Sequence, residues 1–174
     1  MLTQEQQNWL ARLNNTDSVR IIPFDPNCDK KFEKIKRKIQ SKLGTDLRIE
    51  HHGASSLGIS GQDEIDVYVL VKASEFDNTV LRVRSIFGEP KSVGTNKRAR
   101  YKTEIQGKRI DIFVVNEEHE EWQKHKRLKS YLMSNTKALQ EYKELKEKSA
   151  GKSTREYYRI KLEFMNGVLA DLDK

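Results

Sequence analysis

The sequence predicts an α+β protein with a mixed β-sheet flanked by helices and a helical C-terminal portion. Strand-like and helix-periodic segments alternate up to about residue 116. Two of the strand-like runs, 98–105 and 109–115, are joined through Gln106-Gly107, a spacing typical of a hairpin. From residue 117 onward, apolar residues recur at helical spacing.

Length and charge limit the classes of function. A chain of 174 residues has the length of one domain, and its excess of 33 Lys and Arg over 26 Asp and Glu gives a net charge of +7. This charge predicts an anionic partner such as a nucleotide, RNA or a phosphorylated metabolite, although solvated lysine-rich helix faces explain it equally well. No apolar run approaches the roughly 18 residues of a membrane span.

Compartment is indicated by the N-terminus and by cysteine content. The opening residues lack the basic and apolar regions of a signal peptide, and Cys28 is the single cysteine. One cysteine cannot form an intrachain disulfide, which is typical of a reducing compartment. We therefore expect a cytoplasmic protein.

The N-terminal elements follow from caps and periodicity. A peripheral helix is expected over 3–13, and a short strand or an extended segment over 19–24. A further helix is expected from Asn27 or Asp29 to Leu43. Its lysine-rich outer face is interpreted as solvated rather than as a nucleic-acid patch. The buried stripe of this helix is predicted to be Phe32, Ile35, Ile39 and Leu43.

The middle of the chain supplies the rest of the sheet. A strand entering near 47–52 leads into a loop of small residues over 53–61, and a strongly alternating strand follows over 64–72. A helix is expected over 74–87, before the hairpin. We expect one domain over residues 1–174, with an α/β core over about 18–116.

The C-terminal portion, 117–174, is expected to form three helices. They are predicted to pack on the core and to close one wall of a cleft. An interaction protein built on these helices, with affinity for neither metal nor nucleotide, is a further hypothesis.

Three carboxylates mark the candidate site. Glu64 and Asp66 lie two apart on a predicted strand and so project to the same face, where they are suited to bind cations together. The solvent face of an amphipathic strand would give the same pattern. Asp111, however, interrupts an apolar strand, where an unpaired charge is costly. The three together indicate a site beside the Gly/Ser loop.

At this point the motifs resemble a known family. The order Gly53-Ala54-Ser55-Ser56, Glu64-Ile65-Asp66 and Ile110-Asp111-Ile112 resembles the nucleotidyltransferase superfamily. The segment Glu50-His51-His52-Gly53 and the later Glu121-Trp122 are similar to the GrpB family. The resemblance runs from about Ile21 to the C-terminal helices and implies a mixed sheet like the palm of polymerase β.

The resemblance also implies residue roles. Glu64, Asp66 and Asp111 would bind Mg²⁺ or Mn²⁺ and carry catalysis, with Asp111 either binding the second metal or accepting the proton of the attacking hydroxyl. The implied nucleotide-binding residues are Gly53, Ser55, Ser56, Arg155, Tyr158 and Lys161. For the serines the alternative is a small-residue turn, and for the last three it is surface charge with a packed tyrosine.

The implied reaction moves a nucleoside monophosphate from a nucleoside triphosphate to a hydroxyl or phosphate acceptor, with RNA or a small molecule as the acceptor class. The alternative is a non-catalytic protein of the same fold that binds nucleotide or RNA.

Two departures from the family pattern bear on this. Ala54 stands where the family usually has its first serine, so a hydroxyl contact must come from Ser55 or Ser56. Asp111-Ile112-Phe113 stands where many members carry His-x-His. His51 and His52 are expected to be structural hydrogen-bonding residues rather than metal ligands.

Overall fold

A computed structural model describes residues 1–173, which divide into two compact units. One unit comprises residues 24–59 and 63–123 and contains the β-sheet. The other comprises residues 1–23, 60–62 and the chain from 124 onward, and it is helical. The expectation that the whole chain forms a single domain stays a prediction.

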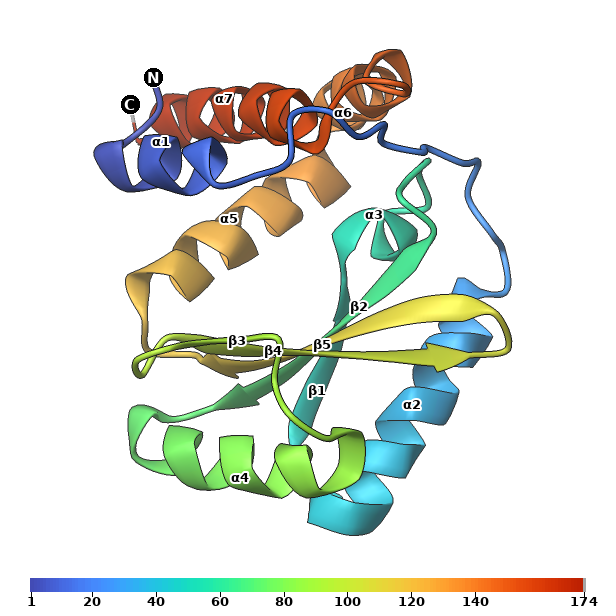
Figure 1. Cartoon of the computed structure of the whole chain (residues 1–174), viewed down its shortest axis with the longest axis vertical. Helices are drawn as coiled ribbons and strands as arrows, with labels where there is room; N and C mark the ends of the chain where they lie inside the picture. The colour runs from blue at the N-terminus through green and yellow to red at the C-terminus, as the bar shows by residue number, and fades with distance from the viewer. Residues whose placement is uncertain (174) are drawn as a thin grey trace. The chain divides into compact units, whose positions relative to one another are not determined.

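The sheet is mixed and five-stranded, in the order β1-β2-β5-β4-β3 (Figure 1). Strands β2 and β5 pair in parallel, and the other neighbouring pairs are antiparallel. The predicted mixed sheet is therefore confirmed, with the parallel pair at its centre. The strands span Arg48–His52 (β1), Glu64–Val71 (β2), Ser92–Gly94 (β3), Arg98–Ile105 (β4) and Lys108–Asn116 (β5).

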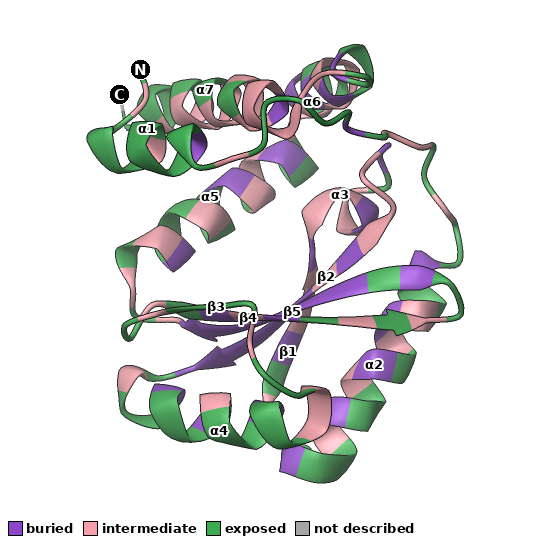
Figure 2. Cartoon of the chain, viewed as in Figure 1, coloured by how far each residue is buried: buried purple, intermediate pink, exposed green. Residues whose placement is uncertain are grey.

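One face of the sheet carries the main hydrophobic core. Two helices, α2 (Cys28–Leu43) and α4 (Phe76–Phe87), cover it (Figure 1). The central strands appear almost wholly buried in Figure 2, whereas the outer sides of both helices are exposed. The predicted stripe of α2 is confirmed, since its apolar residues recur at helical spacing and pack in this core: Phe32, Ile35, Ile39 and Leu43.

The opposite face is different in character. Alternate residues of β2 and β5 form a smaller cluster there, in which the Tyr68 ring packs against those of Phe113 and of Trp122, a residue of the helix that follows β5. Nearer the N-terminal ends of the same strands, three positions of this parity are acidic: Glu64, Asp66 and Asp111. The loop after β1 forms a single helical turn, α3 (Gly53–Ser56), and η1 (Ala73–Glu75) precedes α4.

The helical unit contains α1 (Gln4–Ala11), most of α5 (Glu120–Ser134), α6 (Thr136–Lys148) and α7 (Thr154–Leu172). Side-chain caps begin several of these helices: Thr3 for α1, Asn135 for α6 and Ser153 for α7. The three predicted C-terminal helices are present. None of the helices in the described part of the chain is long and apolar enough to cross a membrane.

Of the two alternatives for residues 19–24, a strand is not formed. Only Ile22 forms an isolated bridge, with Gly61, and the backbone of Val19 bonds to Gly151 and Lys152 instead. Pro23 donates no backbone hydrogen bond, so the segment finds its partners in loops rather than in a ladder. The short strand β3 and the turn α3 were not predicted.

Candidate active site

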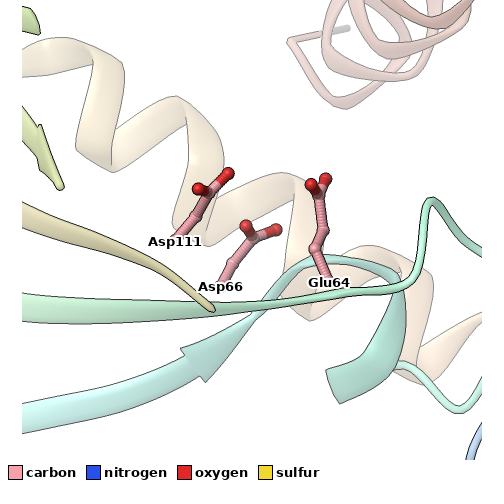
Figure 3. Close-up of side chains that lie close together, drawn as sticks. All are labelled: Glu64, Asp66 and Asp111. Atoms are coloured by element: carbon pink, nitrogen blue, oxygen red, sulfur yellow. The ribbon is translucent and has the colours of Figure 1, made fainter. Parts of the chain in front are cut away.

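The carboxylate cluster, Glu64, Asp66 and Asp111, is assembled by the parallel pair. Asp66 lies directly opposite Asp111 in the β2/β5 register. Because side chains alternate along both strands, Glu64, Asp66 and Asp111 all project from the same face (Figure 3). One carboxylate oxygen of each residue lies within 4.8 Å of those of the other two. The convergence predicted from the sequence is therefore present.

Cations from neighbouring strands balance part of this charge. Arg100 on β4 donates from Nη2 to Oδ2 of Asp111, a residue that is only 4% exposed. Arg109 Nη2 lies 3.6 Å from Oε2 of Glu64. A buried carboxylate is costly without such pairing, so Arg100 explains how Asp111 is tolerated inside an apolar strand.

The entry to β2 is fixed by a second ion-pair network. Asp63 adopts a φ of +63°, a backbone conformation that few non-glycine residues occupy. Its carboxylate accepts from the buried ammonium group of Lys108 on the neighbouring strand β5. The same Nζ lies 3.9 Å from Oδ2 of Asp25. This network holds the chain in place immediately before Glu64.

The glycine of the predicted loop lies directly against the cluster. Gly53 has a φ of +72°, and a Cβ at this position would overlap Oδ2 of Asp66. Only glycine satisfies both the backbone conformation and this close approach. Both serines of the loop form hydrogen bonds with nearby protein groups. Ser56 Oγ donates to the carbonyl oxygen of Gly53 at 2.9 Å, and Ser55 Oγ lies 2.9 Å from Nε2 of His51.

The two histidines have different environments. His52 is 1% exposed and packs against the rings of Tyr68 and Trp122. Its Nε2 lies 3.0 Å from Oε2 of Glu50. Burial works to raise the pKa of Glu50, but hydrogen bonds from His52 and Arg48 outweigh it and hold that pKa below its ordinary value of 4.5.

His51 makes a contact that the sequence did not indicate. Its Nδ1 lies 3.1 Å from Oδ1 of Asp29, a residue in the first turn of α2. No spacing rule links a helix terminus to a strand that far along the chain, so the pair is visible only in three dimensions. The pairing of Arg100 with Asp111 was likewise not predicted.

The remaining predicted nucleotide-binding residues lie on α7, in the helical unit. Arg155 donates from Nη2 to the backbone carbonyl oxygens of Leu13 and Ala11, at 2.9 and 3.0 Å. Lys161 Nζ lies 5.4 Å from the centroid of the Tyr158 ring, which also packs edge-on against Trp9. Arg155 thus holds the N-terminal segment of its own unit. A nucleotide-binding role for Arg155, Tyr158 and Lys161 stays a prediction.

The donor set of the cluster fits a hard divalent cation. Carboxylate oxygens are the ligands that Mg²⁺ and Mn²⁺ prefer, and three of them converge here on one face of a rigid sheet. Glu64 and Asp66 are only partly buried, which leaves room for water or a phosphate oxygen in the coordination sphere. The cluster therefore has the chemistry of a Mg²⁺ or Mn²⁺ site.

Comparison with solved structures identifies the fold. The chain is similar to the conserved protein GrpB from Enterococcus faecalis, with 20% identity and a TM-score of 0.69 over 89% of this chain and 100% of that one. Weaker matches are to polymerase beta from Leishmania infantum. In its ternary P/T complex the identity is 14% and the TM-score 0.39, over 66% of this chain and 50% of that one. In its ternary gap complex they are 13% and 0.38, over 66% and 44%.

Comparison with curated proteins and family models completes the assignment. No curated protein matches the chain. The model of the family described as GrpB protein matches residues 18–171, which include every element of the sheet and the carboxylate cluster. The chain therefore belongs to the GrpB family.

Proposed function

We propose that the protein is a metal-dependent nucleotidyltransferase, which moves a nucleoside monophosphate from a nucleoside triphosphate to a hydroxyl or phosphate acceptor. The observation that carries the proposal is the convergence of Glu64, Asp66 and Asp111 within 4.8 Å on one face of the sheet. The resemblance of the motif order to nucleotidyltransferases supports it. RNA and small molecules are the proposed acceptor classes, and among them the net charge of +7 favours RNA and phosphorylated metabolites.

Each group of the site has a part in this reaction. Glu64, Asp66 and Asp111 would hold Mg²⁺ or Mn²⁺, which supplies charge stabilisation for the attacking and leaving oxygens of an in-line displacement. The Gly53 loop lies against Asp66 and would receive the triphosphate. Arg100, which pairs with Asp111, would add a fixed positive charge beside the metal-binding carboxylates. A cytoplasmic location belongs to the proposal, since a free Cys28 thiol suits a reducing compartment.

The test is transfer of label from α-labelled nucleoside triphosphates to pooled RNA and small-molecule acceptors in the presence of Mg²⁺ or Mn²⁺. Second-sphere changes at metal sites already cost about 10–100-fold, so removing a ligand with Asp66→Asn should reduce transfer by at least about 100-fold. The same substitution at the exposed Asp46 is the matched control and should leave transfer near the wild-type rate. Equal activity of the Asp66→Asn and wild-type proteins would reject the metal site.

A non-catalytic nucleotide- or RNA-binding protein is the second candidate. The pairing of Arg100 with Asp111 favours it, because an arginine already neutralises one carboxylate of the cluster. This function predicts salt-sensitive RNA binding that is insensitive to Asp66→Asn, with no transfer of label.

A further inference from the structure

A row of basic residues runs along β4 on the face of the sheet that carries the carboxylate cluster. Directly opposite residues of neighbouring strands project to the same face, and Lys102 lies opposite Asp111. The next two β4 residues of the same parity, toward the start of the strand, are also basic. Together they form the β4 cation row, which consists of Arg98, Arg100 and Lys102. Alternate residues of a strand are about 7 Å apart, so the row extends about 14 Å along β4 from the cluster.

The β4 cation row is open to solvent. Arg98 and Lys102 are exposed, and the Arg100 side chain is 32% exposed. The register partners of the row on the edge strand β3 are Ser92 and Gly94, which are too small to cover it. In the part of the chain that the structure describes, neither Arg98 nor Lys102 takes part in an ion pair. Two positive charges beside the cluster are therefore available to an external anion.

An aromatic ring holds the two arginines of the row in place. The Cζ atoms of Arg98 and Arg100 lie 5.2 and 5.8 Å from the centroid of the Phe113 ring. Arg100 also donates to Asp111, which ties the row to the carboxylate cluster. A long side chain that already stacks on a ring loses less conformational entropy when it binds an anion. The row is therefore partly organised before a ligand arrives.

The β4 cation row extends from the cluster in one direction only. Beyond Lys102, the next β4 residue of the same parity is Glu104, which is exposed and lies opposite Arg109. A carboxylate there repels a further phosphate. An anion that extends past the cluster is therefore attracted along β4 toward Arg98 and not toward Glu104.

The row and the Gly53 loop flank the carboxylates from opposite sides. In the strand order β1-β2-β5-β4-β3, the loop follows β1 and lies against Asp66 on β2 (Figure 1). The row lies on β4, next to Asp111 on β5. An in-line displacement places the attacking and leaving oxygens on opposite sides of the phosphorus. If the loop receives the triphosphate, the acceptor therefore approaches from the row.

We propose that the β4 cation row binds the phosphate backbone of a single-stranded RNA and places its terminal hydroxyl at Asp111 as the nucleotide acceptor. The acceptor role rests on the proposed function. A row of three cations about 14 Å long complements a repeating polyanion, whereas a small acceptor with one phosphate would use only part of it. Charge complementarity and the length of the row therefore favour RNA over a phosphorylated small molecule.

The reaction extends the RNA by one nucleotide. The terminal hydroxyl oxygen of the RNA forms a bond to the α-phosphorus of the nucleoside triphosphate, and the bond from that phosphorus to the bridging oxygen breaks. Pyrophosphate leaves, and the hydroxyl proton passes to solvent water. The new linkage is a phosphodiester.

The first test measures, by fluorescence anisotropy, how the full-length protein binds a labelled single-stranded RNA in Mg²⁺ at several salt concentrations. The double variant Arg98→Gln/Lys102→Gln should bind at least about 10-fold more weakly, the loss expected for hydrogen bonds to charged groups. The slope of log affinity against log salt concentration should become shallower by about 0.7 for each cation removed. Lys102→Arg keeps the charge and should retain the affinity of the wild type.

Arg37→Gln/Lys38→Gln is the matched control. It also removes one arginine and one lysine from exposed positions, but on α2, which covers the opposite face of the sheet. Lys38 Nζ lies 5.2 Å from the centroid of the Phe87 ring, so the control removes a cation–π contact as well. The control should bind RNA like the wild type. Equal weakening by both double variants would show that binding follows net charge alone and would overturn the role of the row.

The second test follows transfer of label from α-labelled nucleoside triphosphates to the same RNA. The wild type should extend the RNA, and Arg98→Gln/Lys102→Gln should raise the KM for RNA by at least about 10-fold. Its affinity for Mg·ATP, measured by calorimetry, should stay near that of the wild type, because the row lies on the side of the cluster away from the Gly53 loop. Asp66→Asn should abolish extension and still bind RNA.

The outcomes separate this inference from the proposed function. Transfer to a phosphorylated small molecule, with RNA neither bound nor extended, would overturn the inference and leave the proposed function standing. Extension of RNA with an unchanged KM in Arg98→Gln/Lys102→Gln would also overturn the inference alone. RNA binding that depends on the row, without Mg·ATP affinity or transfer to any acceptor, would overturn the proposed function and with it the role of RNA as acceptor.

Discussion

The two faces of the sheet differ although the same strands form both. On the face covered by α2 and α4, β5 presents Ile110 and Ile112, each 0% exposed. On the other face the residue between them, Asp111, is also buried but is charged and paired with Arg100. One step along the backbone therefore separates a position that stabilises the fold from one that serves the candidate site.

Strands β2 and β5 contribute both to the hydrophobic core and to the candidate site, each through a different face. A strand with two buried faces normally reads as a continuous apolar run. Here one face keeps that run, while the other tolerates acidic residues because cations and a glycine loop surround them. Substitutions on the apolar face should therefore lower stability and spare metal affinity, whereas substitutions on the acidic face should spare stability and lower metal affinity.

The largest expected effect is on the apolar face. Ile112→Ala removes a fully buried side chain from the main core and should lower the free energy of unfolding by about 2–5 kcal/mol. Chemical denaturation measures this. Well below the unfolding transition, Mg²⁺ affinity should stay near that of the wild type. Ile105→Ala, at a partly buried position of the same core, is the control and should cost less. A stable Ile112→Ala protein that has lost metal affinity would contradict the assignment of stability to the apolar face and of metal binding to the acidic face.

A smaller effect of opposite sign is expected on the acidic face. Three carboxylates within 4.8 Å repel one another when no cation is bound. Asp66→Asn should therefore raise the metal-free stability, on the order of 1 kcal/mol for one such repulsion at the effective dielectric of a protein surface. We expect Mg²⁺ to raise the melting temperature of the wild type, and Asp66→Asn should remove that rise. Asp46→Asn should do neither, and a destabilised Asp66→Asn protein would show that attraction within the site outweighs repulsion.

The smallest effect concerns the rim of the acidic face. The pKa of Glu50 is held below its ordinary value of 4.5 in the folded protein, despite burial, by hydrogen bonds from His52 and Arg48. Its contribution to stability is therefore fully present above pH 4.5 and is lost as the pH falls through the folded-state value. Unfolding curves measured between neutral and acidic pH should show that the free energy of unfolding falls less steeply with acid in Glu50→Gln than in the wild type. Glu75→Gln, at an exposed position, should show the same pH dependence of stability as the wild type. Identical pH dependence of the wild type, Glu50→Gln and Glu75→Gln would refute the contribution of ionised Glu50 to stability.

The sequence predicted the sheet and the acidic face because both depend on local periodicity. Alternation along 64–72 and 109–115 set which residues share a face, and an aspartate inside an apolar run indicated a site. The sequence left a strand or an extended segment open over 19–24, and no strand forms because this apolar segment next to Pro23 lacks the neighbours that make a ladder. Local pattern carries no information on such partners.

The contacts between distant side chains were beyond prediction. The bonds from His51 to Asp29 and from Arg100 to Asp111 depend on how α2 and β4 pack against the central strands. Charged residues of these types are common on exposed faces, so nothing in the sequence distinguishes the paired ones. Gly53 was assigned to a phosphate loop, but its second constraint, the approach to Asp66, required the coordinates.

The parallel pairing of β2 with β5 also bears on how the protein folds. Antiparallel neighbours can pair directly from a short turn. A parallel pair is joined by a long crossover connection, which here runs through α4, β3 and β4. Contacts between such distant segments form slowly, since loop closure must precede them. Asp66 and Asp111 therefore meet only when the intervening chain has taken its place. Under the proposed function, metal affinity would therefore arise late on the folding path, because a chain with an incomplete sheet holds its acidic residues apart.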